Sequence, residues 1–309
     1  MEKNTNIYIG GSIMSFKKKI ILSIFPFIFV SIISMKAAYA MDTVNGDNYT
    51  ASSAYNMGRY TEGKSVTAIL PAEESSSYFK FTVNTDEKIY VRCSYDKNYS
   101  GMTIGLRDAF DSSISRSSRV YDSSSAIPFL AVNCDGEKNS QTFYVKVERG
   151  SYDITKPMYF SITLYNRIKT GSGSFSFTGN AVNKGNSSMS RLGIDSSVIK
   201  LDLRKNSEIP VGAIVKSVRT SSYQSPSQGN VHHMLMPENA GIWFTSKVSS
   251  ATSGSYDITQ DRGYLVNQIW DFKYNAMATK SSTMNNVKLT FDWIYDLANT
   301  NYQTVISRR

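Results

Sequence analysis

The run Ser77-Tyr78-Phe79-Lys80-Phe81-Thr82-Val83 decides the fold class of this chain. Every second residue of the run, from Phe79 through Phe81 to Val83, is apolar, and Tyr78, Lys80 and Thr82 carry polar groups between them. Successive side chains of a β-strand point to opposite faces, so this period of two predicts a strand with one face buried against a core.

Runs of the same kind recur along the chain and are separated by turn residues, as at 84–86, 96–98 and 135–136. Short alternating strands with regular turns are typical of antiparallel sandwiches. The sequence therefore predicts an all-β protein with two antiparallel, jelly-roll-like β-sandwich domains. The other expected strands are 88–95, 128–134, 142–148 and 159–164 in the first half, and 198–203, 212–218, 231–236, 242–248, 268–274 and 287–295 in the second.

The succession of residues 63–70 (GKSVTAIL), 77–83 (SYFKFTV), 142–148 (TFYVKVE) and 159–164 (YFSITL) resembles the bacterial pre-peptidase C-terminal (PPC) domain family. The resemblance covers residues 51–168 and places 103–108 (TIGLRD) at the family's Leu-Tyr-Asp strand. It implies a jelly-roll-like sandwich that serves as an accessory or binding module.

The chain departs from the family pattern in two respects. Ser76 and Ser77 stand where the family usually carries an acidic residue, so the resemblance does not extend to a metal contact. The module also leads this chain, whereas in the family it usually trails a secreted hydrolase. A resemblance of this kind implies binding and not catalysis.

Composition divides the rest of the chain. Residues 169–190 are rich in Gly, Ser, Asn and Thr and are expected to form a linker. The linker would join a first sandwich at 41–168 to a second at 191–309, for which no family is recognised. Trp243, Trp270 and Trp293 all fall in expected strands of the second domain, where tryptophan more often belongs to the core than to a sugar-binding platform.

The first forty residues have the layout of a secretory signal peptide. Three lysines at 17–19 precede an apolar run at 20–33, and Ala38-Tyr39-Ala40 supplies the small residues of a cleavage site between Ala40 and Met41. A retained membrane anchor is the alternative, but the run is shorter than the roughly 20 residues that a spanning helix needs. Met14 is an alternative start that would give a signal peptide of ordinary proportions.

Charge points to the kind of partner. The chain carries a formal charge of +9, and residues 1–40 hold five lysines against one glutamate, so their removal leaves +5. A modest positive charge on an exported protein suits anionic polymers such as teichoic acids, or phospholipid head groups. A charge that serves solubility alone is the equal alternative. Nucleic acid is not expected as a partner, because no Lys/Arg cluster follows a single predicted element.

Two cysteines lie in the exported part, and each falls on the apolar side of its expected strand. Cys93 shares a face with Ile89 and Val91, and Cys134 shares one with Leu130. In an oxidising compartment a lone pair of this kind predicts a disulfide between Cys93 and Cys134. A catalytic thiol is the alternative, but it would need a nearby histidine.

No arrangement of residues predicts a catalytic or metal site. His232 and His233 are adjacent and would point to opposite faces of a strand, whereas a metal site on a strand wants His-x-His. Gly171-Ser172-Gly173 precedes a strand and is no phosphate loop. The Cys93–Cys134 bond and the Ala40–Met41 cleavage are therefore the specific predictions, with the ligand-binding residues unknown.

Two carboxylate sets remain as alternatives. Asp271, Asp292 and Asp296 lie near aromatic residues and could include a glycosidase pair, although strand-end aspartates are the simpler interpretation. The loop at 96–101 with Asp108 and Asp111 could hold calcium, but it lacks the dense alternation of an EF-hand loop. No cofactor is expected otherwise.

These patterns favour a secreted, non-catalytic protein that binds a cell-envelope or extracellular-matrix polymer. After the signal no second apolar stretch follows, so no transmembrane segment is expected in the mature chain, which would be extracellular or loosely held on the cell wall. Two alternatives stay open: a toxin-like, membrane-acting β-protein and a secreted hydrolase whose site is not recognised.

Overall fold

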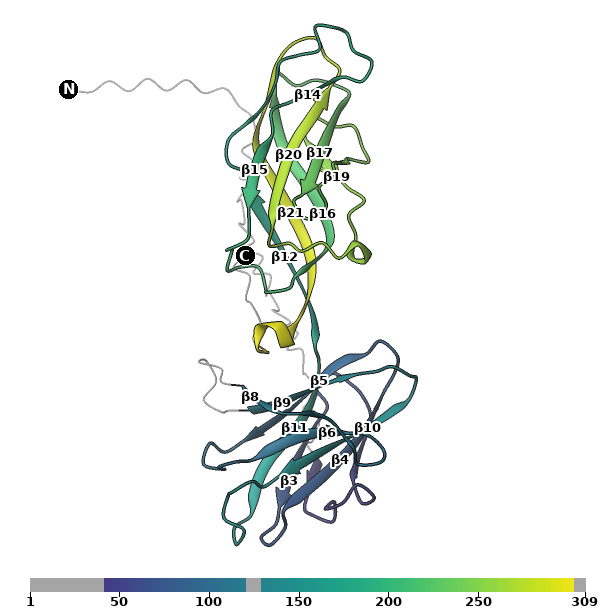
Figure 1. The fold of residues 1–309 in the computed structure, drawn as a ribbon, viewed down its shortest axis with the longest axis vertical. Coiled ribbons are helices and arrows are strands. Elements are labelled where there is room, and N and C mark those ends of the chain that lie inside the picture. Colours follow the sequence, from purple (N-terminus) through teal and green to yellow (C-terminus); the bar gives the residue numbers. More distant parts are fainter. Residues whose placement is uncertain (1–41, 121–128, 303–309) are drawn as a thin grey trace, which may run out of the picture. The chain divides into compact units, whose positions relative to one another are not determined.

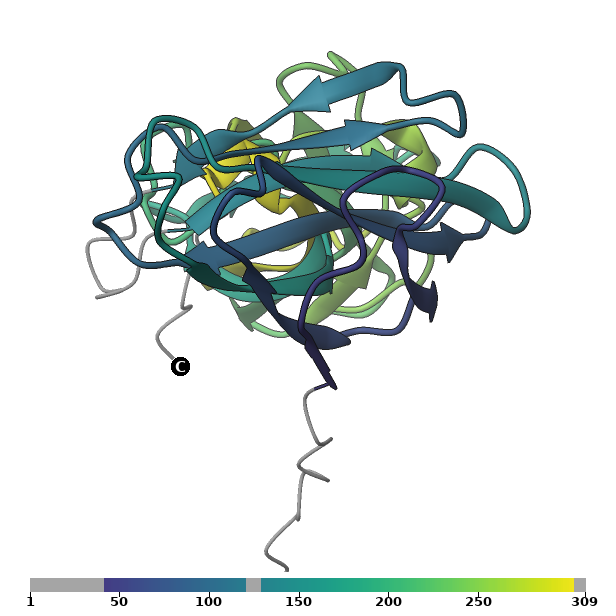
Figure 2. The ribbon, with the colours of Figure 1, turned by 90° about the horizontal axis from the view of Figure 1, so that it is seen from below.

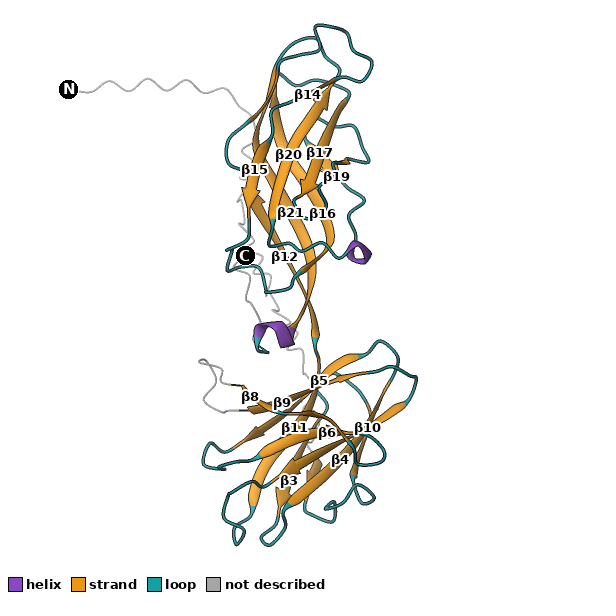
Figure 3. Cartoon of the chain, in the orientation of Figure 1, coloured by secondary structure: helices purple, strands orange, loops and turns teal. Residues whose placement is uncertain are grey.

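The structure is a computed structural model that describes residues 42–120 and 129–302 (Figure 1). Strands dominate this part of the chain, and the helical elements within it are two short 3-10 turns, η1 (Gln260–Arg262) and η2 (Leu297–Thr300) (Figure 3). The strands form four sheets, whose buried residues make up two separate cores. The predicted all-β fold with two sandwiches is confirmed.

The first sandwich contains strands β1 to β11. One of its sheets has the order β1-β3-β11-β5-β9-β8, and the other has the order β2-β4-β10-β6-β7. The strands are β1 (Asp42–Val44), β2 (Tyr55–Arg59), β3 (Ser65–Leu70), β4 (Ser76–Val83), β5 (Lys88–Tyr95), β6 (Thr103–Arg107), β7 (Ser113–Arg116), β8 (Ser118–Val120), β9 (Phe129–Asp135), β10 (Gln141–Glu148) and β11 (Met158–Asn166).

Most ladders of the first sandwich are antiparallel, as expected, but two are not. β1 pairs with β3 in parallel, and β2 pairs with β4 in parallel. Alternation in the sequence shows which side chains face the core, and it is the same for either strand direction. The alternation in the sequence therefore could not distinguish these two parallel ladders from antiparallel ones.

The alternating run at 77–83 lies within β4 and supplies the centre of the first core. Phe79, Phe81 and Val83 are fully buried. Phe79 meets Phe160 of the opposite sheet edge to face, with ring centroids 6.0 Å apart. Figure 2 shows the strands of this sandwich stacked in layers. Burying a phenylalanine stabilises a fold by about 1.5–3 kcal/mol, so these rings hold the two sheets together.

The second sandwich contains strands β12 to β21. One sheet has the order β12-β21-β16-β19 with β13 also on β21, and the other has the order β14-β20-β17-β18 with β15 also on β20. The strands are β12 (Ile168–Ser176), β13 (Ala181–Asn183), β14 (Ile194–Asp195), β15 (Ile199–Asp202), β16 (Ile214–Ser225), β17 (Val231–Pro237), β18 (Phe244–Thr245), β19 (Ser253–Ser255), β20 (Ile269–Ala276) and β21 (Ser282–Asp296).

Two of the three tryptophans belong to the second core. Trp270 and Trp293 are buried, and Trp270 packs on Phe291 of the facing sheet at 5.0 Å between ring centroids. Trp243 is half-buried on the outer side, where the Lys273 ammonium lies 4.4 Å from its ring centroid. The expectation that the tryptophans are core residues therefore holds for two of them.

The expected linker is built into the second sandwich instead. Residues 168–176 form β12, which pairs with β21 along its whole length, and 181–183 form β13. A Cβ atom at Gly171 would lie 2.6 Å from the Trp293 Nε1 atom, and one at Gly173 would lie 2.9 Å from the ring carbon Cη2. These glycines make room for a buried indole. The abundance of glycine suggested a linker, but at these two positions glycine is explained by packing against Trp293.

The step from β11 to β12 is fixed by one buried cation. Arg167 separates the two strands, and its guanidinium lies 2.7 Å from the Asp135 carboxylate and 2.9 Å from that of Asp296. The Tyr302 hydroxyl donates to Asn133 Oδ1 at 2.8 Å nearby. Arg167 is thus the one residue between the last strand of the first sandwich and the first strand of the second.

Candidate functional site

A hollow of about 490 Å³ lies on the outer face of the β2-β4-β10-β6-β7 sheet. Its centre is Gly105 of β6, which pairs with Lys146 of β10 on one side and with Arg116 of β7 on the other. Gly105 lies on the outer face because its neighbours Ile104 and Leu106 point into the core, and Lys146 lies on that face between the buried Val145 and Val147. Arg116 is exposed. A side chain at position 105 would project into this hollow.

Nothing in the fold requires glycine at this position. A Cβ atom on Gly105 would meet only the Ser115 carbonyl oxygen, at an ordinary contact distance of 3.5 Å, and the backbone is not in the left-handed region. Glycine inside a strand costs about 0.5–1 kcal/mol relative to alanine. The fold thus gives up stability here, and what it gains is open space between two cations.

Cationic side chains surround the hollow. The Arg107 Nη1 atom donates to the Asp111 carbonyl at 2.7 Å, which orients its guanidinium. The Lys146 Nζ atom lies 2.7 Å from Glu148 Oε1. This hydrogen bond raises the pKa of Lys146 and holds the pKa of Glu148 below its ordinary value. Both groups of the Lys146–Glu148 pair are therefore charged at neutral pH.

Arg149 lies at the edge of the hollow and is almost fully buried, with 2% of its surface exposed. Its guanidinium donates to four backbone carbonyls, those of Pro71, Glu74, Asp153 and Lys156. Within the described residues no carboxylate forms an ion pair with it. Its hydrogen bonds are satisfied, but its positive charge is not neutralised locally.

The electrostatic balance of the hollow is positive. Four cations, Arg107, Arg116, Lys146 and Arg149, stand against the two carboxylates of Asp111 and Glu148, which leaves a net charge of +2. Guanidinium groups match phosphate, sulfate and carboxylate oxygens with paired hydrogen bonds. The hydroxyls of Ser113, Ser117 and Thr103 add polar groups to the wall. The arrangement can bind an anionic group, and it offers no activated nucleophile.

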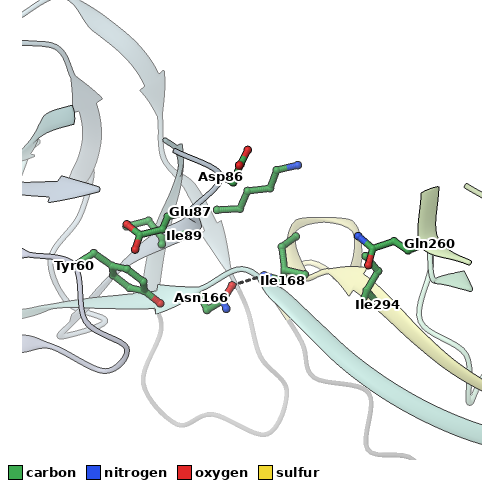
Figure 4. Close-up of a pocket in the computed structure, with 9 residues that line it drawn as sticks. Tyr60, Asp86, Glu87, Ile89, Asn166, Ile168, Gln260 and Ile294 are labelled. Carbon is green, nitrogen blue, oxygen red and sulfur yellow. Dashed lines mark hydrogen bonds between the residues drawn. The ribbon is translucent and has the colours of Figure 1, made fainter. Parts of the chain in front are cut away.

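A second hollow, of about 400 Å³, lies where β11 passes into β12 (Figure 4). It is lined by Ile89, Ile168 and Ile294 together with polar residues, among them Asn166 and Glu87. The Asn166 side chain accepts from the Ile168 amide at 2.9 Å, and Glu87 accepts from the Asn84 amide. Because these groups are engaged within the fold, we assign no ligand to this hollow.

The predicted disulfide is wrong. Cys93 and Cys134 are both free and buried. In the β5–β9 ladder Cys93 faces Leu130, whereas Cys134 faces Ile89, so the cysteines are offset by four residues along paired strands. Four residues span about 14 Å of strand, whereas the Cα atoms of a disulfide lie within about 7 Å. Burial raises the pKa of both thiols, so neither is a reactive thiolate.

The histidines point to opposite faces of β17, as predicted. His233 is fully buried and His232 faces outward. The His233 Nδ1 atom lies 2.8 Å from the Thr220 hydroxyl, which in turn lies 2.8 Å from the Tyr256 hydroxyl. Burial lowers the pKa of His233 from 6.5 to about 4. The ring is therefore neutral at physiological pH and belongs to a polar network inside the core.

The aspartates considered for glycoside hydrolysis do not form a pair. Asp271 lies on β20, in the sheet opposite the other two, and Asp292 and Asp296 are four residues apart on β21. That offset is about 14 Å, beyond the roughly 5–9.5 Å between glycosidase carboxylates. Each has its own partner: Lys200 at 3.3 Å for Asp271, Ser217 at 2.7 Å for Asp292, and Arg167 at 2.9 Å for Asp296.

The aspartates considered for calcium serve local roles. Asp96 Oδ1 accepts from the Asn98 amide, Asp108 Oδ1 accepts from the Phe110 and Ser112 amides, and Asp111 lies against Arg107. In the part of the chain that the structure covers, no three His, Cys, Asp or Glu side chains come together as a metal site would need.

The cleavage site between Ala40 and Met41 lies outside the described residues. Within 42–120 and 129–302, no helix has the length and apolar character to cross a bilayer. The residues around Gly105 were not singled out from the sequence as a site. The available signal was a glycine at an outward strand position, but its cationic neighbours come from β7 and β10, which only the strand pairing brings beside it.

These features define a two-sandwich β-protein with a cationic hollow on its first sandwich. No family model matches the chain. It is, however, 42% identical over 261 residues to the uncharacterized protein YbdN of Bacillus subtilis (strain 168), a match that covers 84% of this chain and 90% of YbdN. The chain therefore belongs to the same family as YbdN.

Solved structures give weaker similarities. The pre-peptidase C-terminal domain of a Bacillus anthracis collagenase matches 36% of this chain and 95% of its own, with 13% identity and a TM-score of 0.26. The CBM22-1-CBM22-2 tandem domain of Paenibacillus barcinonensis Xyn10C matches 75% of this chain and 92% of its own, with 8% identity and a TM-score of 0.31. At these values neither similarity carries an argument about ligand or activity.

Proposed function

We propose that the protein is exported and binds an anionic polymer of the cell envelope or extracellular matrix without chemically changing it. The hollow over Gly105 carries this proposal, because it gathers a net charge of +2 around a glycine that neither packing nor backbone geometry requires. Phosphate-bearing wall polymers such as teichoic acids are the ligand class that this charge and shape suit best.

Three features of the sequence support export and binding. The residues at 17–40 match a signal peptide cleaved between Ala40 and Met41, and the chain that remains has a charge of +5. The resemblance of residues 51–168 to the PPC family supports an accessory, non-catalytic module, extracellular or loosely held on the wall. The described residues contain no arranged nucleophile, base and orienting acid around the hollow.

Binding at this site would depend on charge and on access to the space above Gly105. Arg116 is exposed and Lys146 is partly exposed, so each can reach a phosphate oxygen at the mouth of the hollow. Charges that remain near solvent are screened by salt, with a Debye length of about 8 Å at physiological ionic strength. Retention should therefore weaken steeply as salt rises.

The test is retention of the purified protein on isolated cell walls, with and without teichoic acid, across a salt series. The double variant Arg116→Gln/Lys146→Gln should lose about tenfold or more in affinity, because two charge-assisted hydrogen bonds are removed. The matched control is Lys97→Gln/Lys138→Gln, which removes the same charge from exposed loops of the same sandwich. It should retain binding.

Three outcomes would overturn the proposal: equal losses in both double variants, retention that ignores salt, and turnover of a wall component. The first would mean that net charge alone attracts the protein. The second would point to stacking of carbohydrate on exposed aromatic side chains. The third would identify a hydrolase.

A further inference from the structure

Loops form the end of the second sandwich beside β14 (Figure 1). These loops expose apolar side chains next to cationic ones, and the carboxylate of β14 itself, Asp195, is paired with Lys273 at 2.6 Å. We name this region the β14 end and define it by the loops 184–193, 226–230 and 277–281. Residues 177–194, 219–231 and 276–291 contain no Asp or Glu. Their cations at this end include Lys184, Arg191 and Lys280, all exposed.

Two large apolar side chains project from the first of these loops. Met189 is 77% exposed and Leu192 is 86% exposed, with Arg191 between them. Met189 also adopts a φ of +50°, in the left-handed region that a bulky residue rarely enters. Its amide closes the turn by donating to the Asn186 carbonyl at 3.0 Å, but its side chain makes no contribution to the core.

The loop is held in place by the rest of the β14 end. Asn186 is buried, and its side-chain amide donates to the carbonyls of Ser190 and Met277 and accepts from the Ser190 amide. The Gln228 side chain donates to the Lys280 carbonyl at 2.8 Å. These bonds join the three loops into one platform, so Met189 and Leu192 are presented on a preorganised surface and not on a loose tip.

We infer that the β14 end docks on the surface of an anionic phospholipid bilayer, a binding function beyond the proposed polymer binding. Apolar side chains flanked by cations match the boundary between head groups and acyl chains. At this boundary the apolar side chains are buried, and the cationic side chains stay among the anionic head groups. A soluble anionic polymer would engage the cations and leave Met189 and Leu192 in water. The charge complementarity and the apolar exposure together therefore select a membrane.

The test is cosedimentation of the purified protein with vesicles of phosphatidylglycerol and phosphatidylcholine, and with vesicles of phosphatidylcholine alone. Binding should require phosphatidylglycerol and should fall about tenfold or more in Met189→Ser/Leu192→Ser, since two apolar contacts are lost. The matched control is Phe110→Ser/Val211→Ser, which removes exposed apolar side chains elsewhere and should leave binding unchanged.

A fluorescent label reports insertion directly. Cys93 and Cys134 are buried, so an environment-sensitive dye will react selectively with Leu192→Cys in the native protein. Its emission should shift to the blue on anionic vesicles, whereas a dye on Val211→Cys should not shift.

Several results would overturn the inference. They are binding to phosphatidylcholine alone, unaltered binding of Met189→Ser/Leu192→Ser, loss of binding only when Lys184, Arg191 and Lys280 are neutralised, and no vesicle binding at all. The double variant Arg116→Gln/Lys146→Gln should still bind vesicles, so failure of the polymer proposal and failure of the membrane inference are distinguished.

Discussion

The two sandwiches bury polar groups in different ways. In the first, the buried cation Arg149 is surrounded by four backbone carbonyls, and the core beside it is apolar. In the second, the core contains a network of neutral side chains, in which His233, Thr220 and Tyr256 bond to one another. The first sandwich thus depends on a buried cation that donates to backbone carbonyls, and the second depends on a buried histidine that must stay neutral.

This difference assigns separate vulnerabilities to the two halves. Replacing Arg149 should destabilise the first sandwich at any pH. Acid should destabilise the second sandwich, because protonation of His233 places a charge in its core. Both halves also carry cations on their outer surface, but around an open hollow in the first and beside exposed apolar side chains in the second.

The largest effect is expected at Arg149. Its replacement in Arg149→Met keeps the length of the side chain but leaves four carbonyls without a donor, so the free energy of unfolding should fall by roughly 3–5 kcal/mol. Urea unfolding measures this. Arg116→Met, on the exposed rim, should stay within about 0.5 kcal/mol of the parent. A loss below about 1 kcal/mol at Arg149 would show that water serves those carbonyls equally well.

Acid should act through His233. Its folded pKa of about 4 lies below the ordinary 6.5, so the unfolded chain binds more protons between these values. Stability from this residue is present above pH 6.5, falls as the pH drops towards about 4, and does not change further below that, a loss of about 3 kcal/mol.

The comparison that isolates this contribution is the parent protein against His233→Gln. Carboxylates titrate in both proteins, so the difference between their unfolding free energies at neutral pH and at about pH 4 reports the histidine alone. Parallel pH profiles would contradict the assignment of acid sensitivity to the second core.

Two strand glycines should respond in opposite directions. Gly171→Ala pushes a methyl group against the Trp293 indole and should cost about 1–3 kcal/mol. Gly105→Ala meets only ordinary contacts and should gain about 0.5–1 kcal/mol. Thermal unfolding of both variants checks this, and destabilisation by Gly105→Ala would remove the argument that its glycine serves the hollow.

The smallest effect is expected on reduction. Because both cysteines are free, a reducing agent should leave the mass and the thermal midpoint of the protein unchanged. Thiol reagents should label neither cysteine in the native protein and both in urea, since both are buried. A mass increase of two hydrogens on reduction would restore the disulfide.

The alternation of apolar and polar residues predicted where the strands lie. It did not predict how the strands pair or which residues face one another across a ladder. Residues 88–95 were expected as a strand and form β5 with the same bounds, because Ile89, Val91 and Cys93 alternate against the core. The same alternation placed both thiols on apolar faces correctly. It contains no information on register, so it could not show that Cys93 faces Leu130 and not Cys134.

The structural roles of the strand glycines were the hardest feature to predict from the sequence. Gly171 and Gly173 suggested a linker, because composition cannot reveal a tryptophan that packs on them from a strand more than a hundred residues away. Gly105 lay unremarked within an expected strand. Its importance comes from Lys146 and Arg116, which β-pairing sets on either side of it.

The most direct test of the account measures the affinity of the purified protein for soluble poly(glycerol phosphate) before and after Gly105→Val. Valine suits an outward strand position, places a branched side chain in the hollow between Lys146 and Arg116, and changes no charge, so the variant should fold at least as stably. If the hollow is the polymer site, the affinity of this folded variant should fall about tenfold or more. Unchanged affinity in Gly105→Val would contradict this assignment, because the polymer would then bind without the space that the glycine leaves.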